Sequence, residues 1–337
     1  MVSIKDVARY ARVSVGTVSN VINRPDTVSA DIRARVNAAI GELGYVRSES
    51  ARQLRAGRSR IMALLVLDMA NPFFVDIARG ADQMARAAGL GVMLCNSGQS
   101  PSEEAEYLSL FAEHRVRGLL VTPTDTNGGN IAAFRRHGIP YVIVDRLVPS
   151  DEGCSVSVND VVGGELAVRH LVRAGHTEIA YVSGPSSLAQ CQDRRTGAAA
   201  AVAEAGLPAS ALTVLEVDHP NVASGRDAGS RLLGLSRRPT AVFCVNDLVA
   251  LGVLQAMFAA GVRVPEEMSI VGYDDIEFAA AAAVPLTSVR QPAFRMGQTA
   301  AELLIEEMAE EAVEHTHRRV VFQPELVVRG SSTPGRS

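Results

Sequence analysis

Aromatic residues and long apolar runs are the scarcest features of this sequence. Only 4% of its 337 residues are aromatic and none is tryptophan, so few side chains could stack on a ligand such as a sugar. No apolar run approaches the roughly 18 to 20 residues that cross a bilayer. The opening segment MVSIKDVARY lacks the apolar core of a secretory signal. We therefore expect a cytoplasmic protein that has no membrane partner.

Cysteine and catalytic motifs are equally sparse. The four cysteines are Cys95, Cys154, Cys191 and Cys244. They are far apart and form no CxxC or Cys/His spacing, which argues against a disulfide framework or a zinc site. His315 and His317 lie in a charged segment, where solvated side chains are the expected state. There is no GxSxG elbow, P-loop or HExxH motif, so we expect no enzyme, no cofactor and no metal.

Charge is divided unevenly along the chain. Residues 1–60 contain eleven Lys or Arg residues and five acidic ones, a net charge of +6. The whole chain carries −4, so the remainder carries −10. A small basic segment attached to a larger acidic body favours a polyanionic partner for the basic segment alone. The alternative is a solvated surface, and charge by itself does not decide between the two.

The basic segment has the pattern of three short helices. Ser3, Ser14 and Ser29 are suitable N-caps, and Gly44 is a suitable end for the third helix. The expected core residues are Ile4, Val7, Ala8, Ala11, Val18, Val21, Ile22, Ile32, Val36, Ile40 and Leu43. A helix, a tight turn and a capped second helix favour a helix-turn-helix that reads DNA. The alternative is a helical bundle with no DNA contact.

From residue 61 the pattern becomes an alternation of buried strands and amphipathic helices. Strands are expected at 61–69, 90–97, 118–124, 141–146, 156–159, 179–185, 213–218, 241–247 and 268–275. Helices are expected between them, as at 73–88, 102–115, 160–174 and 248–261. Such an alternation is typical of parallel sheets covered on both faces, and its length indicates two α/β subdomains. Ligands of these sheets bind outside the carboxyl ends of the strands.

The motifs of the chain resemble the lactose/galactose repressor (LacI/GalR) family of bacterial transcription regulators. The resemblance begins in IKDVARYARVSVGTVSNVIN and VSADIRARVNAAIGELGYV, and continues in NPFF, GHTEIAYVSGP, VNDLVALG, VPEEMSIVGYDD and PLTSVRQP, in order along nearly the whole chain. It implies an all-α helix-turn-helix head, a hinge, and a body of two subdomains like a periplasmic binding protein. The implied ranges are 1–45 for the head, 46–60 for the hinge and 61–337 for the body, with an N-subdomain of about 61–159 plus 292–320 and a C-subdomain of about 160–291 plus 321–337.

The resemblance also implies a repressor that binds double-stranded operator DNA, an inverted repeat, as a homodimer. The matching DNA-contact positions are Ser14, Val15, Gly16, Thr17, Ser19, Asn20, Ala51 and Leu54. Thr17 and Ser19 match phosphate contacts, whereas Val15, Gly16 and Asn20 match positions that read bases in the major groove. Leu54 matches a leucine that wedges into the minor groove. The chain departs from the family at YVRS, where a proline is usual, and at Asn20, where many relatives carry Arg or His.

A small-molecule effector is implied in the cleft between the subdomains. The matching positions are Phe73, Phe74, Asp145, Arg194, Asn246 and Asp274. The effector is a sugar or a related metabolite by this resemblance, although Gln190 and Cys191 stand where sugar-binding relatives often carry hydroxyl residues. For each strand-end Asp or Asn the alternative is a helix cap. A transport-associated sugar-binding protein is the rival class, but it would need a secretion signal and no basic head. Induction and corepression both remain open.

Overall fold

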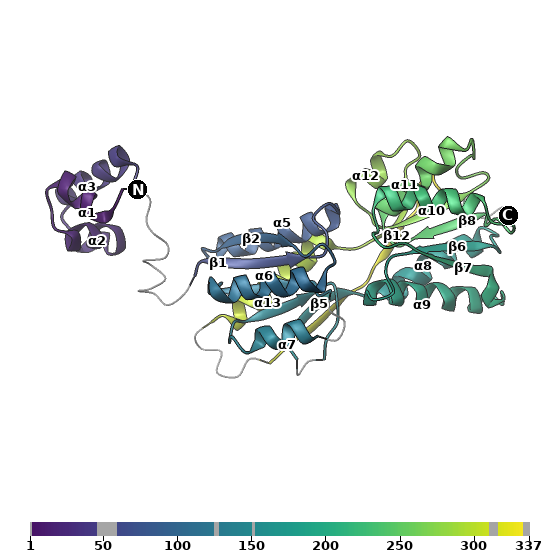
Figure 1. The fold of residues 1–337 in the computed structure, drawn as a ribbon, viewed down its shortest axis with the longest axis horizontal. Helices are drawn as coiled ribbons and strands as arrows, with labels where there is room; N and C mark the ends of the chain where they lie inside the picture. The colour runs from purple at the N-terminus through teal and green to yellow at the C-terminus, as the bar shows by residue number, and fades with distance from the viewer. Residues whose placement is uncertain (1, 46–58, 125–127, 150–151, 310–315, 333–337) are drawn as a thin grey trace. The chain divides into compact units, whose positions relative to one another are not determined.

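The computed structural model describes residues 2–45, 59–124, 128–149, 152–309 and 316–332. The chain divides into two compact units, Met1–Ser59 and Arg60–Ser337, and each is described by itself (Figure 1). None of the helices among the described residues is long and apolar enough to span a bilayer.

The first unit is a helical head built around one small apolar cluster. Its elements are α1 (Ile4–Ala11), α2 (Val15–Asn23), a 3-10 turn (Pro25–Thr27) and α3 (Ala30–Leu43). All eleven predicted core residues belong to the cluster or pack against it. The Ser3 backbone N–H donates to Asp6 Oδ2 at 3.0 Å, which fixes the start of α1. The Arg35 guanidinium donates to the Ala11 carbonyl at 2.9 Å, so α3 also closes the end of α1.

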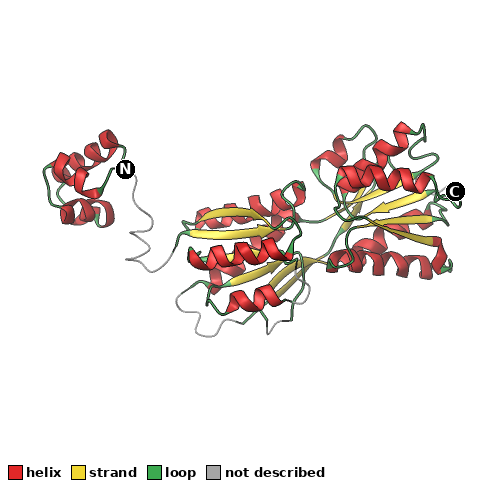
Figure 2. Cartoon of the chain, viewed as in Figure 1, coloured by secondary structure: helices red, strands yellow, loops and turns green. Residues whose placement is uncertain are grey.

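The second unit contains two sheets of six strands each (Figure 2). The first sheet has the order β11-β5-β4-β3-β1-β2, and all its strands are parallel. Its strands are β1 (Ile61–Val66), β2 (Gly91–Asn96), β3 (Gly118–Val121), β4 (Tyr141–Val144), β5 (Cys154–Val158) and β11 (Arg319–Phe322). Its helices are α5 (Pro72–Ala87), α6 (Pro101–Glu113), α7 (Gly129–Arg135) and α13 (Ala293–Glu307). Helices α5 and α13 pack on each other, and α6 packs on α7.

The second sheet has the order β12-β10-β9-β8-β6-β7. It is parallel except for β12, which runs antiparallel to β10. Its strands are β6 (Ile179–Ser183), β7 (Leu212–Glu216), β8 (Ala241–Cys244), β9 (Ser269–Asp274), β10 (Thr287–Arg290) and β12 (Glu325–Val327). Its helices are α8 (Asp160–Arg173), α9 (Ala189–Glu204), α10 (Val222–Leu233), α11 (Asp247–Ala259) and the short α12 (Glu277–Ala281), with a 3-10 turn at Ala209–Ala211.

The helix pairs α8–α9 and α10–α11 cross closely. A Cβ atom on Gly197 of α9 would lie only 1.8 Å from the Val161 carbonyl oxygen of α8, so this contact requires glycine.

The chain passes between the two subdomains three times. The passages lie between β5 and α8, between β10 and α13, and between β11 and β12. The sequence placed the third passage at 320–321, whereas β11 runs to Phe322 and the passage lies at 323–324. All nine predicted strands and the four predicted helices have counterparts. Strands β10, β11 and β12 were not predicted, because each is a short edge or near-edge strand with no long apolar run.

Candidate nucleic-acid interface and ligand cavity

Helix α2 divides into a buried stripe and an exposed face. Val18 is fully buried and Val21 nearly so, whereas Val15 is 41% exposed. Gly16 and Asn20 are exposed as well, and Thr17 and Ser19 are half-buried at the border between the two faces. The exposed face therefore offers one amide, two hydroxyls and one small apolar side chain, groups that suit contact with phosphates and base edges.

The hydroxyl groups of α2 are held by local hydrogen bonds. The Thr17 backbone N–H donates to Ser14 Oγ at 3.0 Å, and the hydroxyls of the two residues lie 2.8 Å apart. Ser14 is therefore the N-cap of α2. The Asn23 side-chain amide donates to the Ser19 carbonyl at 2.8 Å and to Ser19 Oγ at 3.2 Å. These bonds orient the oxygen atoms at both ends of the exposed face.

Gly16 is not required by the packing of the head. A Cβ atom at this position would meet only Ser14 Oγ, at 3.6 Å, which is an ordinary contact. A glycine inside a helix lowers stability relative to alanine, so the fold alone gives no reason for it. The two predicted hinge contacts, Ala51 and Leu54, lie outside the described residues.

In the second unit, one cavity lies at the carboxyl ends of the strands of both sheets. It has about 480 Å³ of empty space, open solvent included. Its lining includes all six predicted effector residues: Phe73, Phe74, Asp145, Arg194, Asn246 and Asp274. It also includes Leu67, Asp68, Asn71, Gln99, Leu188, Gln190, Cys191, Pro220 and Val245. Residues from both subdomains thus meet at one place.

Three of the lining residues have left-handed backbones although none is glycine. The φ angles are 62° at Gln99, 62° at Asp145 and 100° at Asp274. Such conformations are costly for residues with a Cβ atom and concentrate at functional sites. Asp145 follows β4 directly and Asp274 ends β9, so both turns aim a carboxylate into the cavity from a strand end.

Arg194 is held in place by protein groups on several sides. Its Nε donates to Asp160 Oδ1 at 2.7 Å and its Nη1 donates to the Val245 carbonyl at 2.6 Å. Its guanidinium carbon lies 3.7 Å from the centre of the Tyr273 ring, and the Tyr273 hydroxyl donates to Asp160 Oδ1 at 2.8 Å. Two donor groups of Arg194 are therefore already used, and the rest of the guanidinium is presented to the cavity at a fixed angle.

The carboxylates Asp145 and Asp274 connect the two subdomains through amide side chains. Asn71, the N-cap of α5, donates to Asp274 Oδ2 at 2.9 Å, and Gln291 donates to Asp274 Oδ1 at 2.7 Å. Gln190 of α9 donates to Asp145 Oδ2 at 3.1 Å. Burial raises the pKa of Asp274 to about 6 against the lowering effect of Arg194. Burial, together with the charge of Asp160, also raises the pKa of Asp145 well above its ordinary value.

Two acceptor atoms in the cavity are buried and accept no hydrogen bond from the described residues. They are Asp145 Oδ1 and Gln99 Oε1. A buried acceptor without a donor is costly, so a bound molecule with hydrogen-bond donors would fit here. Gln99 was not predicted, because a glutamine in a loop after β2 carries no sequence signal.

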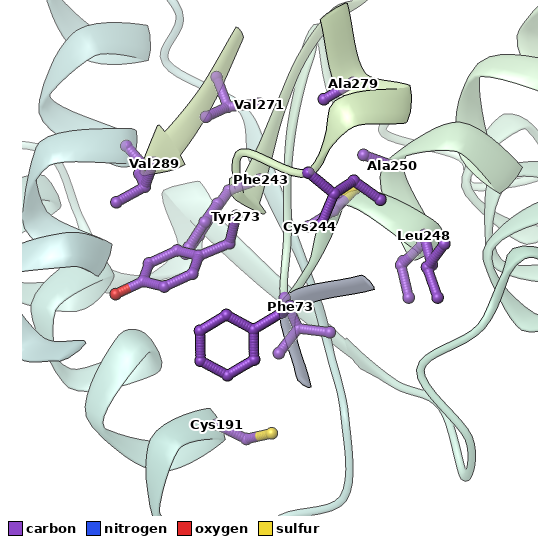
Figure 3. Packing of buried hydrophobic residues seen from close by; sticks show 14 of the residues in the cluster. Phe73, Cys191, Phe243, Cys244, Leu248, Ala250, Val271, Tyr273, Ala279 and Val289 are labelled. Carbon is purple, nitrogen blue, oxygen red and sulfur yellow. The ribbon is translucent and has the colours of Figure 1, made fainter. Parts of the chain in front are cut away.

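The two phenylalanines are more deeply packed than a stacking surface for a sugar would be. Phe73 is 3% exposed and Phe74 is 5% exposed, and their rings meet edge to face with centroids 5.0 Å apart. Figure 3 shows Phe73, from α5, between Cys191 and Tyr273 of the other subdomain. Asn246 lines the cavity, and its side chain also caps α11 by accepting from the Val249 N–H at 2.8 Å. Asn246 is therefore a helix cap, the alternative considered above, and it also lines the cavity.

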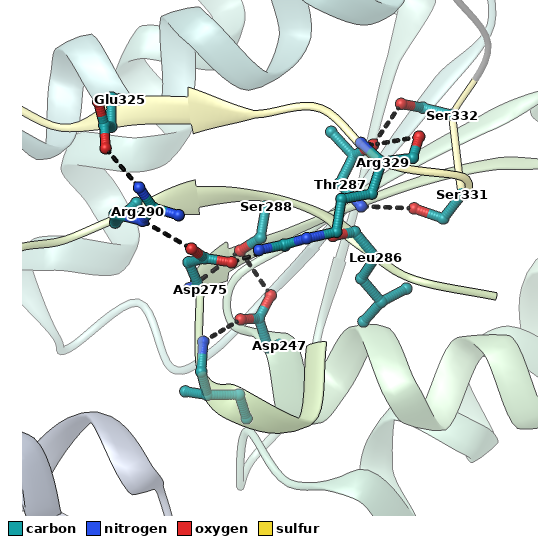
Figure 4. Close-up of polar contacts among 11 residues, drawn as sticks. Asp247, Asp275, Leu286, Thr287, Ser288, Arg290, Glu325, Arg329, Ser331 and Ser332 are labelled. Carbon is teal, nitrogen blue, oxygen red and sulfur yellow. Dashed lines mark hydrogen bonds and ion pairs between the residues drawn. The ribbon is translucent and has the colours of Figure 1, made fainter. Parts of the chain in front are cut away.

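Asp275 belongs to a separate network on the far side of β9 (Figure 4). It accepts from Arg290 Nε at 2.7 Å and pairs with Arg329 at 2.6 Å. Its backbone N–H donates to Ser288 Oγ, which in turn donates to the buried Asp247. Asp275 therefore has a structural role, and it does not line the cavity.

A separate helix-turn-helix unit and a two-subdomain body with a cavity at its strand ends define a class of protein, the ligand-responsive transcriptional regulators. A family model described as bacterial regulatory proteins, lacI family, matches residues 3–48. A second, described as a periplasmic binding protein-like domain, matches residues 168–332. The HTH-type transcriptional repressor PurR of Aliivibrio fischeri (strain MJ11) is 37% identical over 334 residues, covering 98% of each chain. The chain belongs to the lacI family of bacterial regulatory proteins.

Two solved structures of transcriptional regulators are also similar to this chain over nearly its full length. The lac repressor dimer bound to operator and the anti-inducer ONPF is 28% identical, covers 98% of both chains and superposes with a TM-score of 0.82. The transcriptional regulator CelR in complex with cellobiose is 31% identical, covers 98% of this chain and all of that chain, and has a TM-score of 0.73.

Proposed function

We propose that this protein is a cytoplasmic repressor that binds an inverted-repeat operator as a homodimer, and that a small molecule in the cavity changes its affinity for the operator. The convergence of the six predicted effector residues on one cavity is the observation that carries the proposal. The dimer and the operator are supported by the lac repressor structure, whose chain is similar to this one over almost its full length.

The exposed face of α2 is proposed to enter the major groove. Val15 would contact a thymine methyl group, Asn20 would pair with an adenine, and Thr17 and Ser19 would contact phosphates. Ala51 and Leu54 are proposed as hinge contacts, with Leu54 in the minor groove. Because few side chains of α2 read bases, part of the specificity would come from the deformability of the operator.

Operator selection from a random DNA library with the full-length chain tests this part. We expect an inverted repeat whose retention weakens steeply with salt, because phosphate contacts release counterions. In a parallel selection, Asn20→Arg is expected to change the half-site consensus at one position, since Arg pairs with guanine rather than adenine. Absence of any sequence-specific retention would contradict the DNA-binding proposal, and an unchanged consensus would contradict the role of Asn20.

The effector is proposed to be a polar metabolite rich in hydrogen-bond donors, such as a sugar or a nitrogen heterocycle. Asp145 Oδ1 and Gln99 Oε1 each need a donor, and the remaining N–H groups of Arg194 would supply donors to an effector oxygen. Asn246 and Asp274 are proposed to complete the polar contacts. Phe73 and Phe74 would provide the apolar wall, with edge contacts in place of a broad stacking face.

A thermal-shift panel of sugars and nitrogen heterocycles tests the effector site. A true effector is expected to raise the unfolding temperature of the body and to change operator retention at the same concentration. Asp145→Asn should reduce both effects, whereas the exposed control Asp227→Asn should leave both unchanged. A ligand whose effect survives Asp145→Asn and Asn246→Ala would place the effector elsewhere.

A further inference from the structure

A cluster of three chemically different metal-ligating side chains lies outside both sites described above. Cys154, Glu307 and His317 each offer one ligand atom, and these three atoms all lie within 4.8 Å of one another. The residues come from distant parts of the sequence, so no local spacing reveals the cluster. Cys154 begins β5, Glu307 ends α13, and His317 precedes β11 by two residues.

Strand pairing places the cluster at the amino edge of the first sheet. In the parallel pair β5–β11, Ser155 is opposite Arg319, so Cys154 and His317 approach from two adjacent strand starts. The cavity lies at the carboxyl edge of the same sheet, after β4. The cluster is therefore a site of its own, at the same edge of the sheet as the start of β1.

The distances fit a tetrahedral ion. Cys154 Sγ and His317 Nδ1 are 3.8 Å apart. A tetrahedral zinc ion with bonds of about 2.3 Å to sulfur and about 2.05 Å to nitrogen separates these two atoms by roughly 3.6 Å. Glu307 has three rotatable side-chain bonds, so its oxygen can close the remaining gap with a small movement.

The surroundings of the cluster also favour a cation. Glu307 Oε2 is buried and accepts no hydrogen bond from the described residues. The carboxylate also sits at the end of α13, where the helix dipole is negative. The neighbouring guanidinium of Arg318 pairs with Glu306, not with Glu307.

A hydrogen bond orients the sulfur ligand. The Arg318 backbone N–H donates to Cys154 Sγ at 3.3 Å, and the Ser155 N–H donates to the Arg318 carbonyl at 3.0 Å. The Arg318 N–H fixes the direction of the sulfur and partly offsets the burial that raises the pKa of the Cys154 thiol. We propose that Cys154, Glu307 and His317 bind one zinc ion, with a water molecule as the fourth ligand. A thiolate, an imidazole and a carboxylate are a ligand set that suits zinc rather than magnesium or calcium.

Equilibrium dialysis of the untagged, full-length chain against zinc, followed by elemental analysis, tests the proposal. We expect one zinc ion per chain, and at least a tenfold loss of zinc affinity in Cys154→Ser, Glu307→Gln and His317→Gln. The matched controls Cys95→Ser, Glu306→Gln and His114→Gln should bind zinc as the parent chain does. Cobalt should bind at the same site and show thiolate-to-cobalt charge-transfer absorption that Cys154→Ser abolishes.

Thermal unfolding of the same proteins separates loss of the site from loss of the fold. Zinc is expected to raise the unfolding temperature of the parent chain and of the three controls, but not that of the three ligand variants. If a variant without zinc has the same unfolding temperature as the parent chain without zinc, the variant is folded. Its loss of zinc binding then reports on the site and not on the fold. Absence of stoichiometric zinc in the parent chain, or zinc affinity that the three ligand variants do not change, would overturn the proposal.

Discussion

Helix α2 and the cavity of the body use side chains in opposite ways. Helix α2 presents short, exposed or half-buried groups, and its side-chain hydrogen bonds join residues three or four positions apart. The cavity uses charged side chains that are nearly fully buried and bonded across long sequence separations, such as Arg194 with Asp160. We therefore expect single substitutions on the exposed face of α2 to change operator binding more than stability. Substitutions of the buried cavity residues are expected to change both ligand binding and stability.

The largest loss of stability is expected when the buried hydrogen-bond network around Asp160 loses the guanidinium of Arg194. Arg194→Ala leaves Asp160 buried without a counter-charge, which should lower the free energy of unfolding of the body by about 3–5 kcal/mol. Urea unfolding followed by circular dichroism measures it. The adjacent, exposed Arg195→Ala should stay within about 0.5 kcal/mol of the parent chain. Equal losses in the two variants would remove the distinction between cavity and surface.

A pH effect of similar size is expected from Asp274. Because the pKa of Asp274 in the folded chain is about 6, above the ordinary value of 3.8 for an aspartate side chain, the folded state holds this proton more tightly than the unfolded state. The contribution of Asp274 to stability is therefore favourable below about pH 4 and is lost as the pH rises through 6, a change of about 3 kcal/mol. Asp274→Asn should remove that part of the pH dependence, measured by urea unfolding between pH 4 and 8. If the free energies of unfolding of the parent chain and of Asp274→Asn change in parallel between pH 4 and 8, Asp274 does not titrate in this range.

Two valines of α2 provide the sharpest test within the head. Val18 is fully buried and Val15 is 41% exposed. Val18→Ala should lower the stability of the head by about 2 kcal/mol, whereas Val15→Ala should change it by less than about 0.5 kcal/mol but weaken operator retention. Thermal unfolding and filter binding to the selected operator measure the two effects. If Val15→Ala retains the operator fully, this residue does not read a base.

The smallest stability effect is expected at Gly16, and its sign is the informative part. Gly16→Ala should stabilise the head by about 0.5 kcal/mol, because the added Cβ atom has room. The same methyl group should weaken operator binding if the helix backbone approaches the DNA closely at this position. A stabilised head with unchanged operator affinity would show that Gly16 is needed neither for the fold of the head nor for a close approach to DNA.

The sequence predicted the head and the strand-rich body well because their signals are local. Serine caps, core spacing in α2 and continuous apolar strands are each read from neighbouring residues. The six effector positions came from a family resemblance, and the structure brings them to one cavity. What remained unpredicted depends on long-range pairing: Asp160 and Tyr273 around Arg194, Gln99 in the cavity, and the grouping of Cys154 with His317. These contacts join residues with no shared periodicity, so no local pattern indicates them.

The three passages of the chain between subdomains have a consequence for synthesis on the ribosome. The first subdomain is begun at β1, but its helix α13 and its edge strand β11 are made only after β10 of the second. Until residue 307 has emerged, the apolar face that α13 covers has no partner, and β5 has no strand β11 beside it until residue 322 has emerged. The head, in contrast, is complete within the first 45 residues. The nascent chain therefore acquires a folded DNA-binding unit long before it acquires a finished body to regulate it.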